Sequence, residues 1–186
     1  MSIKARIAAI FLTAALPIAA DAATLGGADY APQFDYREFY TATDGKNFRA
    51  ILQGNPFPGV PADEVARRLL PQMQANKPQP RLTFTYDKPA EEQRPDYRVV
   101  FVFDPAADLG ADAACKGTNR HKAGSAGRVY VFAIYCRNDT AMSQVTGWTT
   151  AADPDDPAIG SLFKDVFGTL FNSSPALKPQ LGGGFR

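Results

Sequence analysis

The sequence predicts a single α+β domain, with a mostly antiparallel sheet of about four to six strands. A long C-terminal amphipathic helix and a shorter helix are expected to pack on this sheet. Two observations carry the prediction. Residues 99–103 and 129–136 are apolar on both faces, which is typical of strands inside a sheet that is covered above and below. Residues 157–171 repeat apolar side chains at steps of three and four, the stripe of a helix that lies on such a sheet.

The residues before position 82 predict a hairpin followed by a short helix. Residues 36–43 and 47–53 flank an Asp-Gly dipeptide at 44–45, which suits a tight turn, and together they predict a hairpin. A short helix comes next, because Pro61 fits a first helical turn and Pro71 would break or kink the helix ten residues later.

Two more strands and the start of the last helix complete the domain. Residues 82–86 alternate apolar side chains with threonines, the pattern of a strand with one wet face. Residues 142–149 come after a polar turn and are expected to return along the sheet. Asp156 can cap the last helix, and Pro157 suits its first position.

The ends of the chain are expected to lie outside this domain, which spans residues 36–172. Residues 1–22 have a basic start, an apolar stretch and a small-residue cleavage site, the pattern of a secretory signal peptide removed near Ala22. The apolar stretch is broken well short of the roughly 20 residues that a transmembrane segment needs. Residues 23–35 and 173–186 carry glycine, proline and scattered polar residues without periodicity, which is typical of flexible arms.

Composition narrows the class of protein. The 186-residue chain keeps 164 residues once 22 are removed, enough for one domain with its own core. Lys4, Arg6 and Asp21 leave with the signal, so 20 basic and 19 acidic side chains become 18 of each. This balance does not favour nucleic-acid binding. The mature chain is expected to be soluble and periplasmic or secreted.

The only two cysteines of the chain, Cys115 and Cys136, enclose its only histidine, His121. In an exported chain, two cysteines are best interpreted as a disulfide, whose loop closure stabilises a fold of this kind by about 3 kcal/mol. The alternative is an envelope thiol enzyme or hydrolase that uses a Cys/His pair. A metal site is disfavoured, because two thiols and one imidazole do not supply the ligands that zinc needs.

Basic side chains in and after this loop offer a second alternative. Lys116, Arg120, His121, Lys122 and Arg128 could meet an anionic partner, such as a phosphate-bearing envelope polymer. Solvated loops are often basic without such a role. Anion binding through this loop therefore stays a hypothesis beside the disulfide.

No catalytic residues and no cofactor are predicted. The acidic run of Asp153, Asp155 and Asp156 lacks the central glycine and closing glutamate of a calcium loop, and it favours a turn with a helix cap. The serines lie outside any G-x-S-x-G turn, and the chain has no glycine-rich phosphate loop. These patterns favour a protein that is not an enzyme.

The two strands that are apolar on both faces need cover on both sides of the sheet, while the chain offers only two predicted helices. The predicted hairpin at residues 36–53 could fold over the second face. If it does not, that face is a place for an envelope protein or polymer, or for a second copy of the chain in a homodimer.

Four segments resemble, in order, a family of small, uncharacterised exported proteins and lipoproteins of bacteria: FRAILQGNPFP, YRVVFVFDP, VFAIYCRNDTAMSQVTG and DPAIGSLFKDVFGTLF. The likeness covers residues 36–171 and implies an envelope protein, with Cys115 and Cys136 matching the two cysteines that the family tends to carry. No activity, ligand or catalytic set comes with this family. Many of its members have a lipid-bearing cysteine after the signal, which this chain lacks.

Together, these observations favour a non-enzymatic, soluble periplasmic protein that acts as a structural or accessory binding module of the cell envelope. The alternatives are the thiol enzyme or hydrolase and the anion-binding protein described above.

Overall fold

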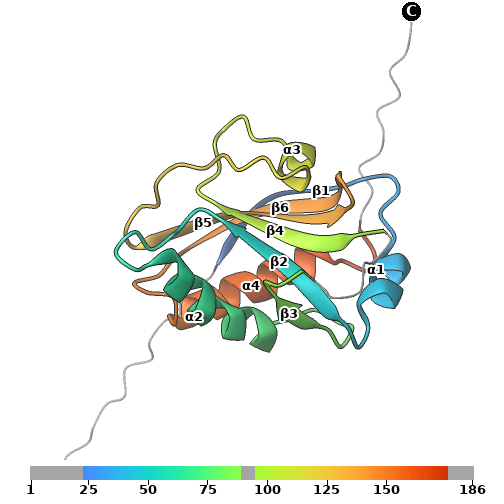
Figure 1. The fold of residues 1–186 in the computed structure, drawn as a ribbon, viewed down its shortest axis with the longest axis horizontal. Helices are drawn as coiled ribbons and strands as arrows, with labels where there is room; N and C mark the ends of the chain where they lie inside the picture. The colour runs from blue at the N-terminus through green and yellow to red at the C-terminus, as the bar shows by residue number, and fades with distance from the viewer. Residues whose placement is uncertain (1–22, 89–94, 176–186) are drawn as a thin grey trace, which may run out of the picture.

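The computed structural model of the chain describes residues 23–88 and 95–175, which form one six-stranded mixed sheet with four helices (Figure 1). The α+β class and the packing of a C-terminal helix on the sheet are confirmed. The predicted signal peptide and most of the predicted tail lie outside the described residues. In chain order, the elements are β1 (Thr24–Tyr30), α1 (Tyr36–Thr43), β2 (Asn47–Gln53), α2 (Ala62–Ala75), β3 (Thr83–Thr85), β4 (Tyr97–Phe103), α3 (Ala111–Cys115), β5 (Arg128–Arg137), β6 (Thr140–Thr150) and α4 (Pro157–Leu170).

The order of the strands in the sheet is β1-β6-β5-β4-β2-β3. The pairs β1–β6, β6–β5 and β5–β4 are antiparallel, whereas β2 runs parallel to both β4 and β3. Parallel neighbours need a crossover connection, and helix α2 supplies the one between β2 and β3. Three of the five strand pairings in the described sheet are antiparallel, in agreement with the prediction, and both parallel pairings involve β2.

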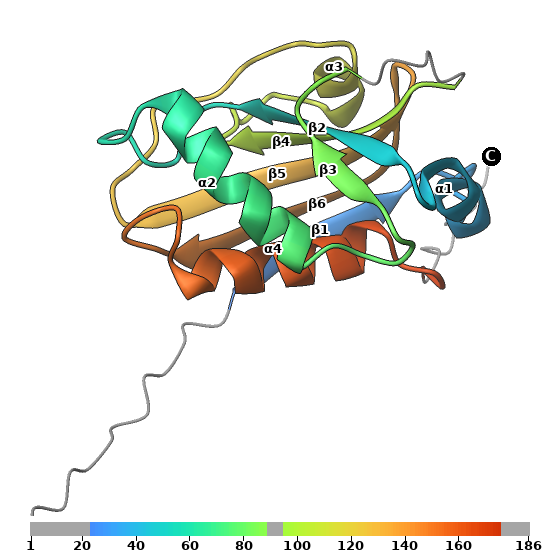
Figure 2. The same cartoon turned by 60° about the horizontal axis from the view of Figure 1, so that its bottom comes forward.

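One face of the sheet, called here the first face, carries the main hydrophobic core. Helices α2 and α4 lie across this face, as Figure 2 shows. Val99 and Phe101 of β4 point to this side and are fully buried, together with Phe163 and Phe167 of α4. The ring of Phe101 meets that of Phe163 edge-on, at 5.6 Å between centroids. Each such side chain stabilises the fold by about 1.5–3 kcal/mol through its burial.

The opposite face, called here the second face, carries a smaller core. Val100, Val102 and Ile134 are buried there against helix α3 and the segment around it. The cover thus comes from the chain between β4 and β5, and the prediction that residues 36–53 could cover this face is wrong. Farther along the second face, Trp148 of β6 stays 36% exposed.

Residues 36–43 form helix α1, so the prediction of a strand in a hairpin is wrong. The side chain of Asp35 caps this helix by accepting a hydrogen bond from the Arg37 backbone N–H at 2.8 Å. Phe39 and Thr43, four residues apart, are buried on one side of it. A cap and a buried helical face outweigh the tendency of these aromatic and β-branched residues to form strands.

The structure differs from the prediction in two further elements. Residues 24–30, inside the predicted arm 23–35, form strand β1 along β6, with a shift in register between Leu25 and Ala28 that interrupts the alternation. Helix α2 passes through Pro71 instead of ending there. Pro71 is exposed, so the backbone carbonyl that it leaves without a partner can bind water.

The other predicted elements are confirmed. The segments 82–86, 99–103, 129–136 and 142–149 correspond to β3, β4, β5 and β6. Asp156 caps α4 by accepting a hydrogen bond from the Ala158 backbone N–H at 3.0 Å. Among the helices of the described residues, none has the length and apolar character that crossing a membrane requires.

Candidate functional site

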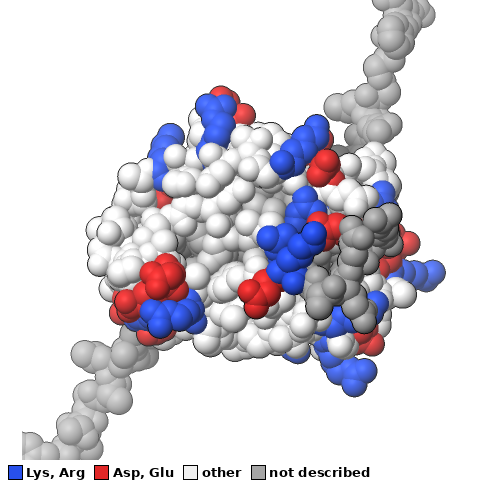
Figure 3. All heavy atoms as spheres, in the orientation of Figure 1, with Lys and Arg blue, Asp and Glu red and all other residues white. Residues whose placement is uncertain are grey.

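A pocket of about 480 Å³ opens on the second face, beside the disulfide. Side chains of β2 and the start of β4 line it, together with the end of α3 and the residues after it. We call it the second-face pocket. In the orientation of Figure 1, charged side chains form several separate clusters around the molecule, most with basic and acidic groups side by side, and a broad uncharged area lies between them (Figure 3).

Two arginines are neighbours in this pocket, because Arg49 of β2 pairs with Arg98 of β4. Paired strands lie about 4.8 Å apart, so two like charges are held close together. Asp96 compensates Arg98 at 2.6 Å, and Asp139 lies 3.8 Å from the same guanidinium. Arg49 has no ion pair or hydrogen bond of its side chain within the described residues, and its Nε is buried without a partner.

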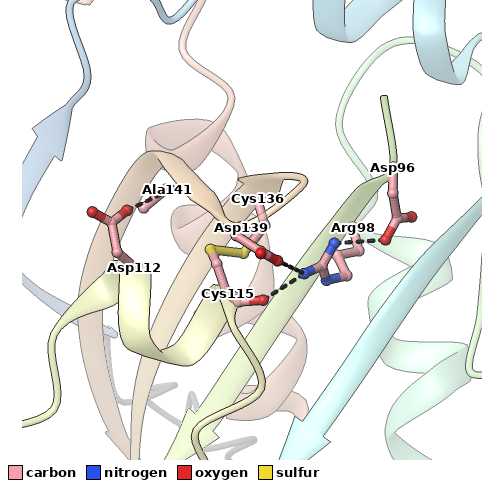
Figure 4. Close-up of a disulfide and its surroundings, with 7 residues drawn as sticks. All are labelled: Asp96, Arg98, Asp112, Cys115, Cys136, Asp139 and Ala141. Atoms are coloured by element: carbon pink, nitrogen blue, oxygen red, sulfur yellow. Dashed lines mark hydrogen bonds and ion pairs between the residues drawn. A yellow bond between two sulfur atoms is a disulfide. The ribbon is translucent and has the colours of Figure 1, made fainter. Parts of the chain in front are cut away.

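The disulfide fixes the position of Arg98. Cys115, the last residue of α3, is bonded to Cys136 of β5, with 5.7 Å between the Cα atoms, so the predicted disulfide is confirmed. Cys136 is the antiparallel partner of Arg98, and the Arg98 guanidinium donates a hydrogen bond to the backbone carbonyl of Cys115. Figure 4 shows the sulfur bridge and the guanidinium side by side. The bridge therefore holds one side of the pocket against the sheet.

Gln53, the last residue of β2, is the second unusual group in the pocket. The residue is only 7% exposed, and its Oε1 is buried with no hydrogen-bond partner in the described part of the chain. An unpaired buried acceptor costs about 1–3 kcal/mol. Native proteins keep few such groups, and those they keep require an explanation such as a role in function or a bound molecule.

The described residues that line the pocket carry more positive than negative charge. Both carboxylates among them, Asp96 and Asp139, pair with Arg98, which leaves the other cations without an acidic partner among these described lining residues. Such an excess attracts anions. The basic residues that line the pocket are Arg49, Lys88, Arg98 and Lys116.

The structure does not bring the basic residues of the predicted anion-binding loop into one site. Lys116 lines the second-face pocket. Arg120 forms an ion pair with Asp108 at 2.8 Å, and the guanidinium of Arg128 lies over the ring of Tyr130, 5.7 Å from its centroid. Only Lys116 among the predicted anion-binding residues therefore belongs to this pocket.

His121 lies away from the disulfide. It pairs with Pro105, just beyond the end of β4, whereas Cys136 pairs with Arg98 near the start of that strand. The length of β4 separates the two places by roughly 20 Å. The Nδ1 atom of His121 lies 3.1 Å from the backbone carbonyl of Lys122, and both cysteines are consumed in the disulfide. A reduced Cys/His pair is thus contradicted.

Three of the loop's basic side chains act on Asp104 instead. Asp104 comes directly after β4 with a φ of 48°, and its Oδ2 is buried without a partner in the described residues. Burial raises the pKa of Asp104, and attraction to Arg128, His121 and Lys122 opposes this rise only in part. The basic character of this part of the loop therefore compensates a carboxylate of the protein itself.

Asp104→Asn is expected to raise the free energy of unfolding at pH 7, by less than about 1 kcal/mol because solvent screens much of the charge. When the pKa of a carboxyl group is higher in the folded chain than in the unfolded one, the free energy of unfolding falls as the pH rises through the folded pKa. The stability advantage of the variant over the wild type should therefore vanish below about pH 4, where the carboxyl is protonated in both the folded and the unfolded chain. Asparagine tolerates the positive φ of this position.

Urea unfolding at pH 3.5 and pH 7 measures this effect. Asp108→Asn is the matched control, because it removes the same charge from an exposed ion pair with Arg120 and should give no gain at pH 7. A loss of stability in the Asp104 variant at pH 7 would contradict the role given to burial.

The acidic run before α4 binds an arginine instead of forming a cation site. Asp153 and Asp155 form ion pairs with Arg68 of α2 at 3.0 and 2.6 Å, which ties α2 to the start of α4. Across residues 23–88 and 95–175, no group of three or more His, Cys, Asp or Glu side chains is arranged to hold a metal ion.

Sequence reasoning missed Arg49, Gln53 and Arg98. A signal was present: Arg49 and Gln53 fall on the same face of one strand, and Arg98 stands at the start of a strand that is otherwise apolar. Polar side chains on the buried face of a strand need partners. Their meeting in one pocket depends on the alignment of β2 with β4.

No protein-family model matches the chain, and no curated protein matches it. Among solved structures, the chain is similar to one chain of PelC from Paraburkholderia phytofirmans, in the structure of a dodecamer of a single-substitution variant. The TM-score is 0.43 and the sequence identity is 13%, and the similarity covers 80% of this chain and 97% of the PelC chain. At this level of similarity, no residue role passes from that protein to this chain.

Proposed function

We propose that this chain is an exported, disulfide-bonded binding module of the bacterial cell envelope that has no catalytic role and holds its ligand in the second-face pocket. The periplasm or the cell exterior is the location in keeping with the expected signal peptide and with the Cys115–Cys136 bond, since disulfides persist in oxidising compartments.

The observation that carries the proposal is the buried Oε1 of Gln53, which has no hydrogen-bond partner among the described residues and lies in a pocket large enough for a small molecule. A scaffold selected only for stability would replace this side chain with an apolar one, because an unpaired acceptor costs stability and a leucine of similar size does not. Groups of this kind are retained where binding uses them.

The chemistry of the pocket supports binding more than catalysis. Arg49 and Arg98 supply charged hydrogen-bond donors whose planar guanidinium groups match the oxygens of a bound anion. The disulfide beside them offers no free thiol. The acidic residues of the pocket are held by Arg98 and are not arranged as an acid and base pair.

Titration of the ¹⁵N-labelled mature protein with a sonicated extract of envelope polysaccharide tests this function. We expect the side-chain amide signals of Gln53 and the Nε–H signal of Arg49 to shift, together with backbone signals of β2. Shifts confined to other parts of the protein, or no shift at any extract concentration, would contradict the placement of the ligand site.

Gln53→Leu is expected to raise the free energy of unfolding by about 1–2 kcal/mol, because it removes an unpaired buried acceptor. The same variant should lose its response to the extract. Gln74→Leu is the matched control, since Gln74 accepts a hydrogen bond from Phe84 N–H at 2.8 Å and donates one to the Leu82 carbonyl at 3.1 Å.

Chemical denaturation of both variants and of the wild type measures these changes. The Gln74 variant should be less stable than the wild type by about 1 kcal/mol, the reverse of the Gln53 variant. If Gln53→Leu is also destabilising, the acceptor is satisfied in the free protein and the main support for the proposal is gone.

A further inference from the structure

We propose that the second-face pocket binds an oxyanion carried on a hydroxylated body, that is, a carboxylated or phosphorylated sugar unit. This inference rests on the proposed function and names the chemical class of the ligand. Three features of the described part of the pocket lead to it: a guanidinium without an acidic partner there, an acceptor without a donor there, and the distance between the two.

The anionic part is inferred from the pair of arginines. Arg98 is held in place by Asp96 and by the Cys115 carbonyl, so its charge is largely compensated within the protein. Arg49 stands beside it in the neighbouring strand with no acidic partner in the described residues. An oxyanion relieves the repulsion between the two, and a guanidinium binds carboxylate or phosphate oxygens in a two-pronged geometry.

The hydroxylated part is inferred from Gln53. Its buried Oε1 needs a hydrogen-bond donor, and a bare anion such as phosphate or a carboxylate offers mainly acceptors. A sugar hydroxyl both donates and accepts, so it can satisfy this oxygen. The ligand therefore needs a negative group at one end and a donor at the other.

The spacing of the two groups fits a molecule rather than an ion. Arg49 and Gln53 lie on the same face of β2 four residues apart, which places their Cα atoms roughly 13 Å from each other. Ile51 lies between them on that face and gives an apolar surface, partly buried, for the body of the ligand. The pocket volume of about 480 Å³ lies in the range of small-molecule sites.

Four defined probes test the inference by calorimetry and by the Gln53 and Arg49 signals: glucuronate, glucose 6-phosphate, glucose and inorganic phosphate. We expect at least one of the two sugar anions to bind at least ten-fold more tightly than both glucose and phosphate. Their relative affinity distinguishes a carboxylated from a phosphorylated source. The preference should weaken as salt rises, since charge attraction contributes to it.

The contrary outcomes separate this inference from the proposed function. Binding of glucose as tight as that of the sugar anions would overturn the anionic class and leave the binding function standing. Binding of phosphate as tight as that of the sugar anions would overturn the need for a hydroxyl donor. Failure of all four probes overturns the ligand class, and the function falls with it only if the envelope extract also leaves the pocket signals unmoved.

Arg49→Met should weaken the binding of the preferred sugar anion by about ten- to one-hundred-fold, the usual worth of a hydrogen bond to a charged group. The variant is expected to fold, because the Arg49 side chain has no polar partner to lose in the described residues. Arg67→Met removes the same charge from an exposed position on α2 and should leave the affinity unchanged. Equal losses in the two variants would indicate an effect of net charge and contradict the site.

Discussion

Phe39→Ala is expected to lower the free energy of unfolding by about 3–5 kcal/mol, the usual cost of deleting a buried aromatic ring. Phe39 is fully buried and joins helix α1 to the sheet and to the end of α4. Its ring stacks on that of Phe171 at 4.1 Å between centroids and meets those of Tyr135 and Phe48 at 5.4 and 5.8 Å. Alanine would leave a cavity and lose all three of these ring contacts at once.

Urea or guanidinium unfolding followed by circular dichroism measures this loss. Tyr40→Ala is the matched control on the same helix, because Tyr40 is 42% exposed and its loss should cost within about 0.5 kcal/mol. Similar stabilities of the two variants would contradict the orientation of α1. A Phe39 variant too unstable to purify would still be informative through Phe39→Leu, which should cost less than the alanine.

Replacing both Cys115 and Cys136 by alanine is expected to lower the free energy of unfolding by about 3 kcal/mol, from the lost closure of the loop between them. The effect should extend to the second-face pocket, because the Arg98 guanidinium binds the backbone carbonyl of Cys115. The affinity of the pocket for its ligand should fall with the stability.

Reduction of the wild type provides the matched comparison. Unfolding curves of the wild type with a thiol reductant should approach those of the double alanine variant, while the variant itself should not respond to the reductant. Alkylation without prior reduction should add no mass to the wild type, since both cysteines are bonded. Two alkylated thiols in the untreated protein would contradict the bond and the oxidising location proposed for the chain.

The central strands and the last helix were predictable because their signals are local. Residues 99–103 and 129–136 are apolar on both faces and lie in β4 and β5. Other parts of the chain cover these strands on both sides of the sheet, which requires apolar side chains on both faces. Asp156 and Pro157 mark the start of α4 by chemistry that needs no partner elements. In these segments, local preference and tertiary packing agree.

The N-terminal part was not predictable for the opposite reason. The residues of α1 include aromatic and β-branched side chains that favour a strand, and the helix is decided by the Asp35 cap and by the burial of Phe39 against elements far along the chain. Strand β1 contains Gly26 and Gly27 where its register shifts, so no alternation is visible.

The candidate site also has one part that could be predicted from the sequence and one part that could not. The disulfide could be predicted, because the expected export and a single pair of cysteines leave one pairing. The pocket could not, because Arg49 and Arg98 are separated by two other elements and meet only through the parallel register of β2 and β4. The role of Asp104 was hidden for a related reason, since its burial depends on the segment that folds over it.

The two outermost strands of the sheet limit how copies of this chain can associate. An open strand edge invites another chain to add to the sheet, which leads to aggregation. Here one edge is β3, only 3 residues long, and the other is β1, whose register shift disturbs a flat run of free backbone groups. Growth into fibres by strand addition at these two strands is therefore disfavoured.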